Sequence, residues 1–179
     1  MTVLADPILT ERMELRPLRT SDAGPISLFA GDVRVARMTT AIPHPYPPGA
    51  AEAFIEAALS GRRNERVWVL DGTRSGGSEL IGLISARPRE GGEFEIGYWV
   101  GPPFWNTGYA SEALAALIRP LFAEGARRLT ASVFQDNPVS AHVIERAGFA
   151  RIGRGELHSV ARGGMVPTWT YALDRPLRG

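Results

Sequence analysis

The spacing of apolar and polar positions predicts alternating strands and helices along the chain. Met13 to Leu18 alternates apolar with polar residues, which is typical of a half-buried strand. Thr20 to Asp22 are helix-capping residue types, and apolar residues from Ile26 to Phe29 supply one face of a helix. Four prolines between Ile42 and Gly49 exclude a helix or central strand and predict a stiff loop. A helix over Ala50 to Leu59 follows.

Three strands are predicted next, and they form an antiparallel meander. Arg66 to Leu70 is the first, and it ends at an Asp71-Gly72 dipeptide that is typical of a hairpin. Leu80 to Ala86 is the second, and Phe94 to Val100 is the third.

A longer helix is predicted over Thr107 to Glu124. Its apolar residues recur at three- and four-residue spacing over about four turns. They are Ala110, Ala113, Leu114, Leu117, Ile118, Leu121 and Phe122. Pro120 lies inside this helix and should kink or end it, because proline has no backbone N–H to donate.

The remaining elements complete an α/β fold. A strand over Leu129 to Phe134 precedes a short helix over Pro138 to Ala147, which Gly148 should terminate. Two last strands flank an Arg-Gly-Gly turn, and they lie around Ala150 to Leu157 and Pro167 to Leu173. This order predicts a mixed sheet with helices. The length of 179 residues predicts a single domain over residues 1–179.

Composition narrows the possible functions. The net charge is +1 and there is no run of Lys or Arg, so a nucleic-acid partner is not predicted. The absence of cysteine excludes a disulfide framework, a thiolate metal site and a cysteine nucleophile, and no metal is predicted. No segment approaches the roughly 20 apolar residues of a membrane span, and the start lacks a signal-peptide pattern. We therefore expect a cytoplasmic protein with no membrane partner.

The segment from Pro103 to Leu114 carries the clearest candidate chemistry. A strand ends at Val100, a loop with Gly and Pro follows, and a long helix begins. The N-terminus of a helix presents unpaired backbone N–H groups and a partial positive charge, which suit a phosphate. Gly108 and the small Ala110 would let an anion approach closely. No Lys follows Gly108, so this is not a P-loop, and a plain strand-to-helix connection remains the alternative.

Three segments resemble the GNAT acetyltransferase superfamily, in particular its RimJ/RimL-like branch. FEIGYWVGPPFWNTGYASEAL (94–114) is similar to the family's acetyl-CoA segment, and VFQDNPVSAHVIERAGF (133–149) to its second cofactor segment. LTERMELRPLRTSDAGPI (9–26) is similar to the opening of that branch. The resemblance implies a twisted, mostly antiparallel sheet of about six to seven strands, flanked by about four helices, with a V-shaped cofactor cleft.

The resemblance also implies which residues contact acetyl-CoA. The strand would offer backbone groups to the pantetheine arm from Tyr98, Trp99 and Val100. The loop would wrap the pyrophosphate with the backbone N–H groups of Trp105, Asn106, Thr107, Gly108, Tyr109 and Ala110. Asn137 matches the residue that hydrogen-bonds the arm, and Ser140 the residue near the sulfur. Trp105, Asn106 and Thr107 depart from the family's usual Gln, Arg and Gly, so only backbone contacts are expected there.

The catalytic candidates are Ser140, Glu95 and His158. Ser140 is the candidate donor to the departing thiolate, because the family's usual Tyr is replaced by Ile144. Glu95 lies about 16 Å before Val100 at ~3.3 Å per residue and is a candidate base. His158 is another candidate base, because histidine is the side chain most often used to take up a proton near neutral pH, and Glu156 is a further candidate. Each could instead be a surface or helix-face residue.

The implied activity is acetyl transfer from acetyl-CoA to a primary amine, by direct attack in a ternary complex. The amine could belong to a protein N-terminus or to a small molecule, and a homodimer is an open possibility. A catalytically inactive CoA-binding sensor or interaction module of the same fold is the main alternative. An unrelated small α/β protein with a phosphate ligand is the third. Five aromatic-ring residues could line an acceptor entrance between the proline-rich loop and the end of the chain: His44, Tyr46, Phe54, Trp99 and Trp169.

Overall fold

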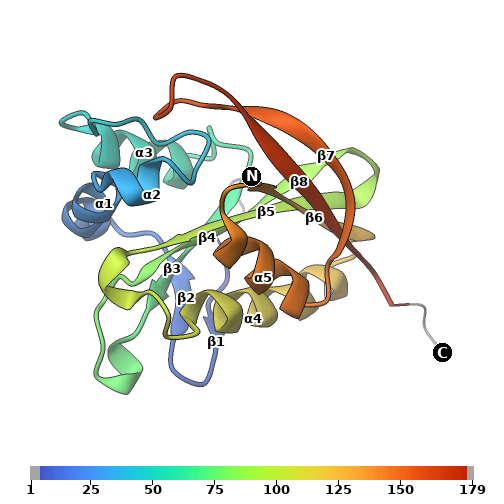
Figure 1. Ribbon diagram of the computed structural model, residues 1–179. Coiled ribbons are helices and arrows are strands. Elements are labelled where there is room, and N and C mark those ends of the chain that lie inside the picture. The colour runs from blue at the N-terminus through green and yellow to red at the C-terminus, as the bar shows by residue number, and fades with distance from the viewer. Residues whose placement is uncertain (1–4, 177–179) are drawn as a thin grey trace.

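One sheet of eight strands organises the chain, and the computed structural model describes residues 5–176. The strand order is β1-β2-β3-β4-β5-β6-β8-β7, and every neighbouring pair is antiparallel except β5 and β6 (Figure 1). The strands are β1 Ile8–Leu9, β2 Glu14–Pro17, β3 Arg66–Asp71, β4 Gly82–Arg89, β5 Glu93–Val100, β6 Arg128–Phe134, β7 Ala150–Ser159 and β8 Gly164–Asp174. The helices are α1 Ala23–Ala30, α2 Val33–Ala36, α3 Ala50–Leu59, α4 Tyr109–Ala123 and α5 Pro138–Arg146.

The helices cover the sheet from two sides. Buried apolar residues of α4 and α5, such as Leu117 and Ile144, form one core with strand residues such as Ile96. Buried residues of α1 and α3, such as Ile26 and Ile55, form a second core on the other face. Figure 1 shows α1 to α3 grouped on one side of the strands and α4 with α5 on the other. The α/β sandwich therefore has two separate cores, one on each face of the sheet.

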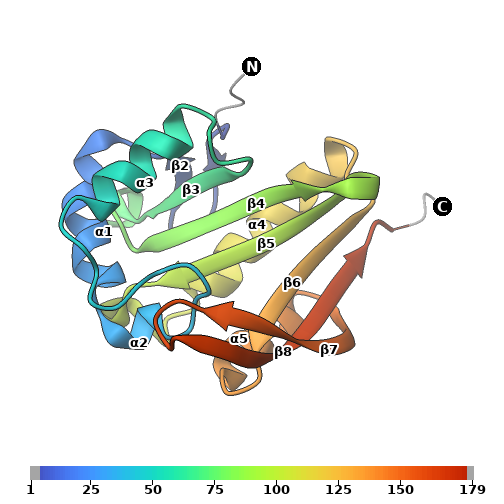
Figure 2. The same ribbon diagram turned by 90° about the horizontal axis from the view of Figure 1, so that it is seen from above.

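The sheet splits between β5 and β6. The two strands pair in parallel only from Glu93 to Glu95, which lie opposite Arg128 to Thr130. Beyond these three residues, β5 keeps its partner β4 and β6 keeps its partner β8, but the two strands no longer pair with each other. Figure 2 shows them diverging from this joined end. The predicted V-shaped opening is thus present, and its vertex lies at Glu95.

The α/β fold with a mostly antiparallel sheet is confirmed, and the differences lie in short elements. The sheet has eight strands, because the two-residue β1 adds an edge, and the four-residue α2 was also missed. The Asp71-Gly72 dipeptide does not form a tight hairpin, since Asp71 ends β3 and about ten residues connect it to β4. Pro120 does not break α4, which continues to Ala123 because Leu117 and Leu121 remain in the core.

No helix within residues 5–176 is both long enough and apolar enough to cross a lipid bilayer.

Candidate active site

One edge of β5 is open where the sheet splits. The Gly101 N–H donates to the Ile81 carbonyl at 2.8 Å, so residues 81 and 101 form a hydrogen-bonded antiparallel pair. Because such pairs alternate along a ladder, Trp99 also directs its backbone groups to β4. Tyr98 and Val100 direct theirs away from β4, toward the split. Of the three predicted pantetheine-binding positions, Trp99 is therefore not available through its backbone, and Tyr98 and Val100 face the right way.

The Val100 carbonyl already accepts a hydrogen bond from a side chain of the protein. It accepts a hydrogen bond from the indole Nε1–H of Trp105 at 2.7 Å. The guanidinium of Arg34 lies over the exposed Trp105 ring, 5.4 Å from its centroid. The N–H of Val100 therefore faces the split without a partner and its carbonyl is shared with Trp105, while both backbone groups of Tyr98 are open. The side chain of Trp105 has a structural contact that the sequence did not indicate.

The loop before α4 is shaped to present backbone N–H groups. Asn106 and Gly108 both have positive φ, at 59° and 82°, and Gly108 is the N-cap of α4. Asparagine and glycine tolerate this conformation best. Within the described residues, the N–H groups from Asn106 to Ser111 have no backbone acceptor, whereas the N–H of Trp105 donates to Pro102. The loop therefore presents free N–H groups from Asn106 onward, as the prediction of an anion-binding turn requires, but the Trp105 N–H is used inside the loop.

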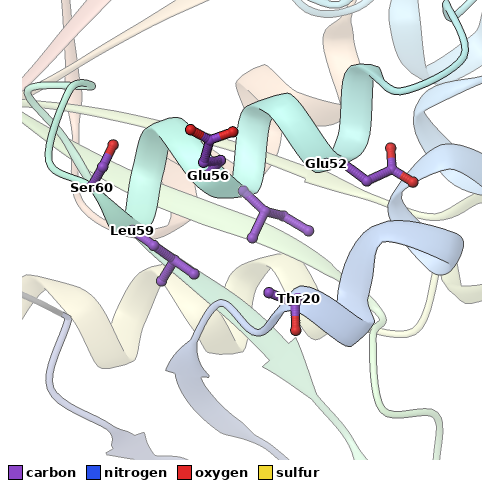
Figure 3. A pocket seen from close by; sticks show the side chains of 6 residues that line it. Thr20, Glu52, Glu56, Leu59 and Ser60 are labelled. Carbon is purple, nitrogen blue, oxygen red and sulfur yellow. The ribbon is translucent and has the colours of Figure 1, made fainter.

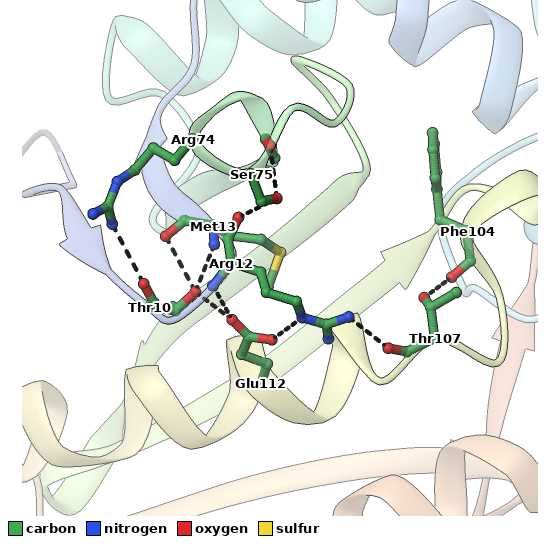
Figure 4. Close-up of polar contacts among 9 residues, drawn as sticks. Thr10, Arg12, Met13, Arg74, Ser75, Phe104, Thr107 and Glu112 are labelled. Atoms are coloured by element: carbon green, nitrogen blue, oxygen red, sulfur yellow. Dashed lines mark hydrogen bonds and ion pairs between the residues drawn. The ribbon is translucent and has the colours of Figure 1, made fainter.

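An ion pair between Arg12 and Glu112 lies beside this loop and contacts it (Figure 4). Glu112, in the first turn of α4, accepts from Arg12 Nε at 2.7 Å, from the Arg12 N–H at 2.8 Å and from the Thr10 hydroxyl at 2.7 Å. Burial raises the pKa of the Glu112 carboxyl, but the hydrogen bonds from Thr10 and Arg12 outweigh it and the net pKa is lowered. The partial positive charge at the N-terminus of α4 also stabilises a carboxylate at this position. Sequence reasoning missed this pair, although Arg12 lies in the resembling N-terminal segment.

Asn137 and Ser140 lie at the start of α5. The Asn137 side-chain oxygen accepts the Ser140 N–H at 3.2 Å and caps the helix. The Ser140 hydroxyl lies 2.7 Å from the hydroxyl of Tyr98 on β5. Ser140 therefore connects α5 to the other side of the split. Asn137 has a structural role as a cap, and its amide nitrogen is not used by that bond.

Glu95 lies at the vertex of the split, on the opposite face of β5 from Tyr98. Strand alternation places its side chain on the face shared with Gly97 and Trp99, and Trp99 packs against the α1 and α3 core. Its carboxylate forms an ion pair with Arg89 on β4. Glu95 and Ser140 thus approach the split from different faces of the sheet. Before Glu95 could act as a base, its carboxylate would have to leave Arg89.

The other candidate bases lie on the exposed edge strand β7. His158 pairs in register with Met165 near the tip of the β7–β8 hairpin, and Glu156 pairs with Pro167. Both side chains are exposed, and no hydrogen bond or ion pair involves either side chain within residues 5–176. The structure does not bring them together with Glu95.

The hairpin tip does reach the segment before the proline-rich loop. The Val160 N–H donates to the Thr40 carbonyl at 3.0 Å, and Arg162 Nε donates to the Arg37 carbonyl at 2.7 Å. The predicted entrance residues separate, however. Tyr46, Phe54 and Trp99 pack with the α1 and α3 core, Trp169 packs with the α4 core, and His44 is exposed.

A separate groove lies away from the split, between α3 and the turn before α1 (Figure 3). It has a volume of about 370 Å³. Its lining residues are Thr20, Glu52, Ile55, Glu56, Leu59 and Ser60, which include none of the predicted site residues. Residues 5–176 also contain no group of three or more potential metal-ligating side chains close enough to hold an ion.

The open strand edge and the adjoining loop suit a long ligand with amides at one end and a diphosphate at the other. The edge offers backbone donors and an acceptor at Tyr98, and the loop offers N–H groups from Asn106 to Ser111. Residues 12–150 match the acetyltransferase (GNAT) domain family. The chain belongs to the GNAT acetyltransferase family.

Relatives of this GNAT protein support the assignment along its length. The uncharacterized N-acetyltransferase YoaA of Bacillus subtilis (strain 168) is 30% identical over 176 residues, which cover 95% of this chain and 98% of YoaA. The name of YoaA, an N-acetyltransferase, agrees with the family assignment over nearly the whole length of this chain.

Solved structures share the fold. Mycobacterium smegmatis RimJ, in complex with CoA-disulfide, has a TM-score of 0.78 at 20% identity, covering 94% of this chain and 86% of RimJ. The microcin C7 self-immunity acetyltransferase MccE, in complex with acetyl-CoA and AMP, has a TM-score of 0.80 at 17% identity, covering 92% and 93%. This GNAT chain therefore has the fold of proteins that bind CoA or acetyl-CoA.

Proposed function

We propose that this GNAT protein transfers an acetyl group from acetyl-CoA to a primary amine, by direct attack in a ternary complex. The observation that supports this most is the split between β5 and β6, which leaves the Tyr98 backbone open beside the unpaired N–H groups from Asn106 to Ser111. Family membership adds the donor, since acetyl-CoA and CoA occupy structures of the same fold. We propose the cytoplasm as the location and a protein N-terminus or small-molecule amine as the acceptor.

The reaction requires a neutral amine and a stabilised leaving group. An alkylamine has a pKa near ~10 and is protonated at neutral pH, so a base must take its proton. We assign this role to Glu95 or His158. Measuring the turnover of two single variants, Glu95→Gln and His158→Asn, distinguishes between them. As the amine nitrogen bonds to the acetyl carbon, the carbon–sulfur bond breaks and its electron pair goes to sulfur. The Ser140 hydroxyl donates a hydrogen bond to that sulfur. Holding both reactants together lowers the rest of the barrier.

Two measurements test the proposal. Titration calorimetry with acetyl-CoA and CoA tests binding, and release of free thiol from acetyl-CoA with a panel of amines tests turnover. We expect binding of both ligands and turnover with at least one amine. Binding without turnover would instead support the CoA-binding sensor, and a protein that binds neither ligand would contradict both. A response to nucleotides but not to CoA would support the unrelated phosphate-ligand protein.

Ser140→Ala tests the assigned donor. A hydrogen bond to a charged group contributes about 1.5–3 kcal/mol, so kcat should fall roughly 10- to 100-fold. The Kd for acetyl-CoA should change little, because the Asn137 cap uses the Ser140 backbone N–H, which the variant keeps. Turnover equal to that of the unmodified protein would remove Ser140 from the mechanism.

A further inference from the structure

Two hydroxyl groups meet across the split, and the proposed mechanism uses only one of them. Tyr98 Oη on β5 and Ser140 Oγ on α5 are 2.7 Å apart, although the residues are 42 positions apart in the sequence. Tyr98 faces the same side of β5 as Ile96 and packs partly buried against the α4 core. The Tyr98 hydroxyl also donates a longer hydrogen bond, of 3.4 Å, to the Ser140 carbonyl, so its single proton has two acceptors and the Ser140 hydroxyl oxygen is the nearer one. Both neighbours of the phenol oxygen thus belong to Ser140.

The Tyr98 phenol is a permanent donor. Burial raises its pKa to about 12, although the contact with Ser140 acts in the opposite direction. The phenol therefore stays neutral and keeps its proton over the pH range in which an amine acetyltransferase would work. A neutral phenol beside a serine can donate a hydrogen bond to the Ser140 hydroxyl oxygen. The O–H of the serine is then free to point elsewhere.

Ser140 is held from its backbone side as well. Its N–H donates to the Asn137 side chain at 3.2 Å, in the first turn of α5. Asn137 thus holds the Ser140 backbone, and a hydrogen bond from Tyr98 would hold the hydroxyl oxygen, which leaves the Ser140 O–H to rotate toward a ligand. Catalytic donors are most effective when neighbouring hydrogen bonds fix them before the reaction begins.

We infer that Tyr98 is a positioning residue that donates to the Ser140 oxygen and thereby aims the Ser140 proton at the departing sulfur. This inference rests on the proposed function. When the carbon–sulfur bond breaks, its electron pair stays on sulfur and the Ser140 O–H donates to it. Tyr98 keeps its proton throughout and only orients and polarises the serine. No further reactant is needed.

Tyr98→Phe tests this role, because it removes one oxygen and keeps the packed ring. We expect kcat to fall about three- to ten-fold, the effect of one neutral hydrogen bond. The KM for acetyl-CoA should change little, because the backbone groups that face the split remain. The Tm should change little, because the ring stays packed against the core. The matched control is Tyr171→Phe, which removes a buried hydroxyl that donates to Glu145 at 2.9 Å on another part of the sheet. Its kcat should equal that of the unmodified protein.

A double-mutant cycle separates positioning from packing. If Tyr98 acts through Ser140, Tyr98→Phe should lower kcat in the unmodified protein but have no further effect in Ser140→Ala. Equal losses in both backgrounds would overturn the inference, as would an unchanged kcat in Tyr98→Phe alone. If the unmodified protein acetylates no amine, both the proposed function and the inference fail. If it is active but the two losses are additive, only the inference fails.

Discussion

The guanidinium of Arg12 bridges the two sides of the Gly108 turn. Its Nη1 donates to the Thr107 carbonyl at 2.9 Å and its Nε to Glu112 at 2.7 Å. The same group lies 4.3 Å from the centroid of the Tyr109 ring. One side chain from the start of the chain therefore fixes the carbonyl before Gly108, the ring after it and the acid one turn into α4. We therefore expect the conformation of the proposed phosphate loop to depend on Arg12.

Arg12→Ala should weaken CoA binding without abolishing folding. The loop would lose two charge-assisted contacts and would have to be ordered by the ligand, so we expect the Kd for CoA to rise about ten-fold. Calorimetry measures this directly. Arg128→Ala is the control, because it removes an exposed ion pair between the first residue of β6 and Asp174, the last residue of β8. Equal changes in the two variants would mean that Arg12 does not act through the loop.

Gly108→Val should also weaken CoA binding. Gly108 has a φ of 82°, and a β-branched residue is strained there by roughly 1–2 kcal/mol or more. We expect the loop to rearrange and the Kd for CoA to rise at least ten-fold. Gly125→Val is the matched control, since Gly125 follows α4 with a φ of 108° and is far from the loop in sequence. Both variants should lose stability, and a Kd that rises equally in both would contradict the proposed site.

Most elements could be predicted because their apolar spacing matches what the cores require. The helix over Ala50 to Leu59 has the predicted bounds, and β5 begins one residue earlier than expected. Elements of two to four residues, such as β1 and α2, carry too few positions for a period to show. The continuation of α4 through Pro120 depends on tertiary packing of Leu121, which local propensity does not contain.

In the candidate site, the sequence predicts the backbone turn and single side chains such as Ser140, but not the pairs of side chains that meet across the fold. The turn at Gly108 follows from a strand, a glycine and a helix in order. The contact of Tyr98 with Ser140 joins residues 42 positions apart, and that of Arg12 with Glu112 joins residues 100 apart. Such pairs depend on which faces the folded sheet brings together, and no local pattern encodes them.

Arg16→Met should destabilise the fold strongly. Arg16 is 2% exposed, and its guanidinium pairs with Asp22 at 2.9 Å and with Asp71 at 2.6 Å. Removing it leaves two nearly buried carboxylates without their cation, which costs about 3–5 kcal/mol. Urea unfolding measures the loss. Arg128→Met, at an exposed pair, should cost less than ~1 kcal/mol, and similar losses in the two variants would refute a special role for the buried cluster.

The same cluster predicts a pH dependence of stability that can be traced to Asp71. Burial raises the pKa of Asp71, but hydrogen bonds from Thr73 and Arg16 outweigh it and the net pKa lies below its usual value. A carboxyl whose pKa is lower in the folded state stabilises the fold above its unfolded pKa of about 3.9 and loses this contribution as the pH falls through its folded pKa.

Asp71→Asn removes this titration and leaves the other carboxyls in place. The free energy of unfolding of the unmodified protein should exceed that of Asp71→Asn near neutral pH, and the difference should narrow as the pH falls below about 4. Urea unfolding of both proteins at a series of pH values measures the difference, in which effects of the remaining carboxyls largely cancel. A difference that stays constant down to the acid limit would show that Arg16 and Thr73 do not favour the charged form of Asp71.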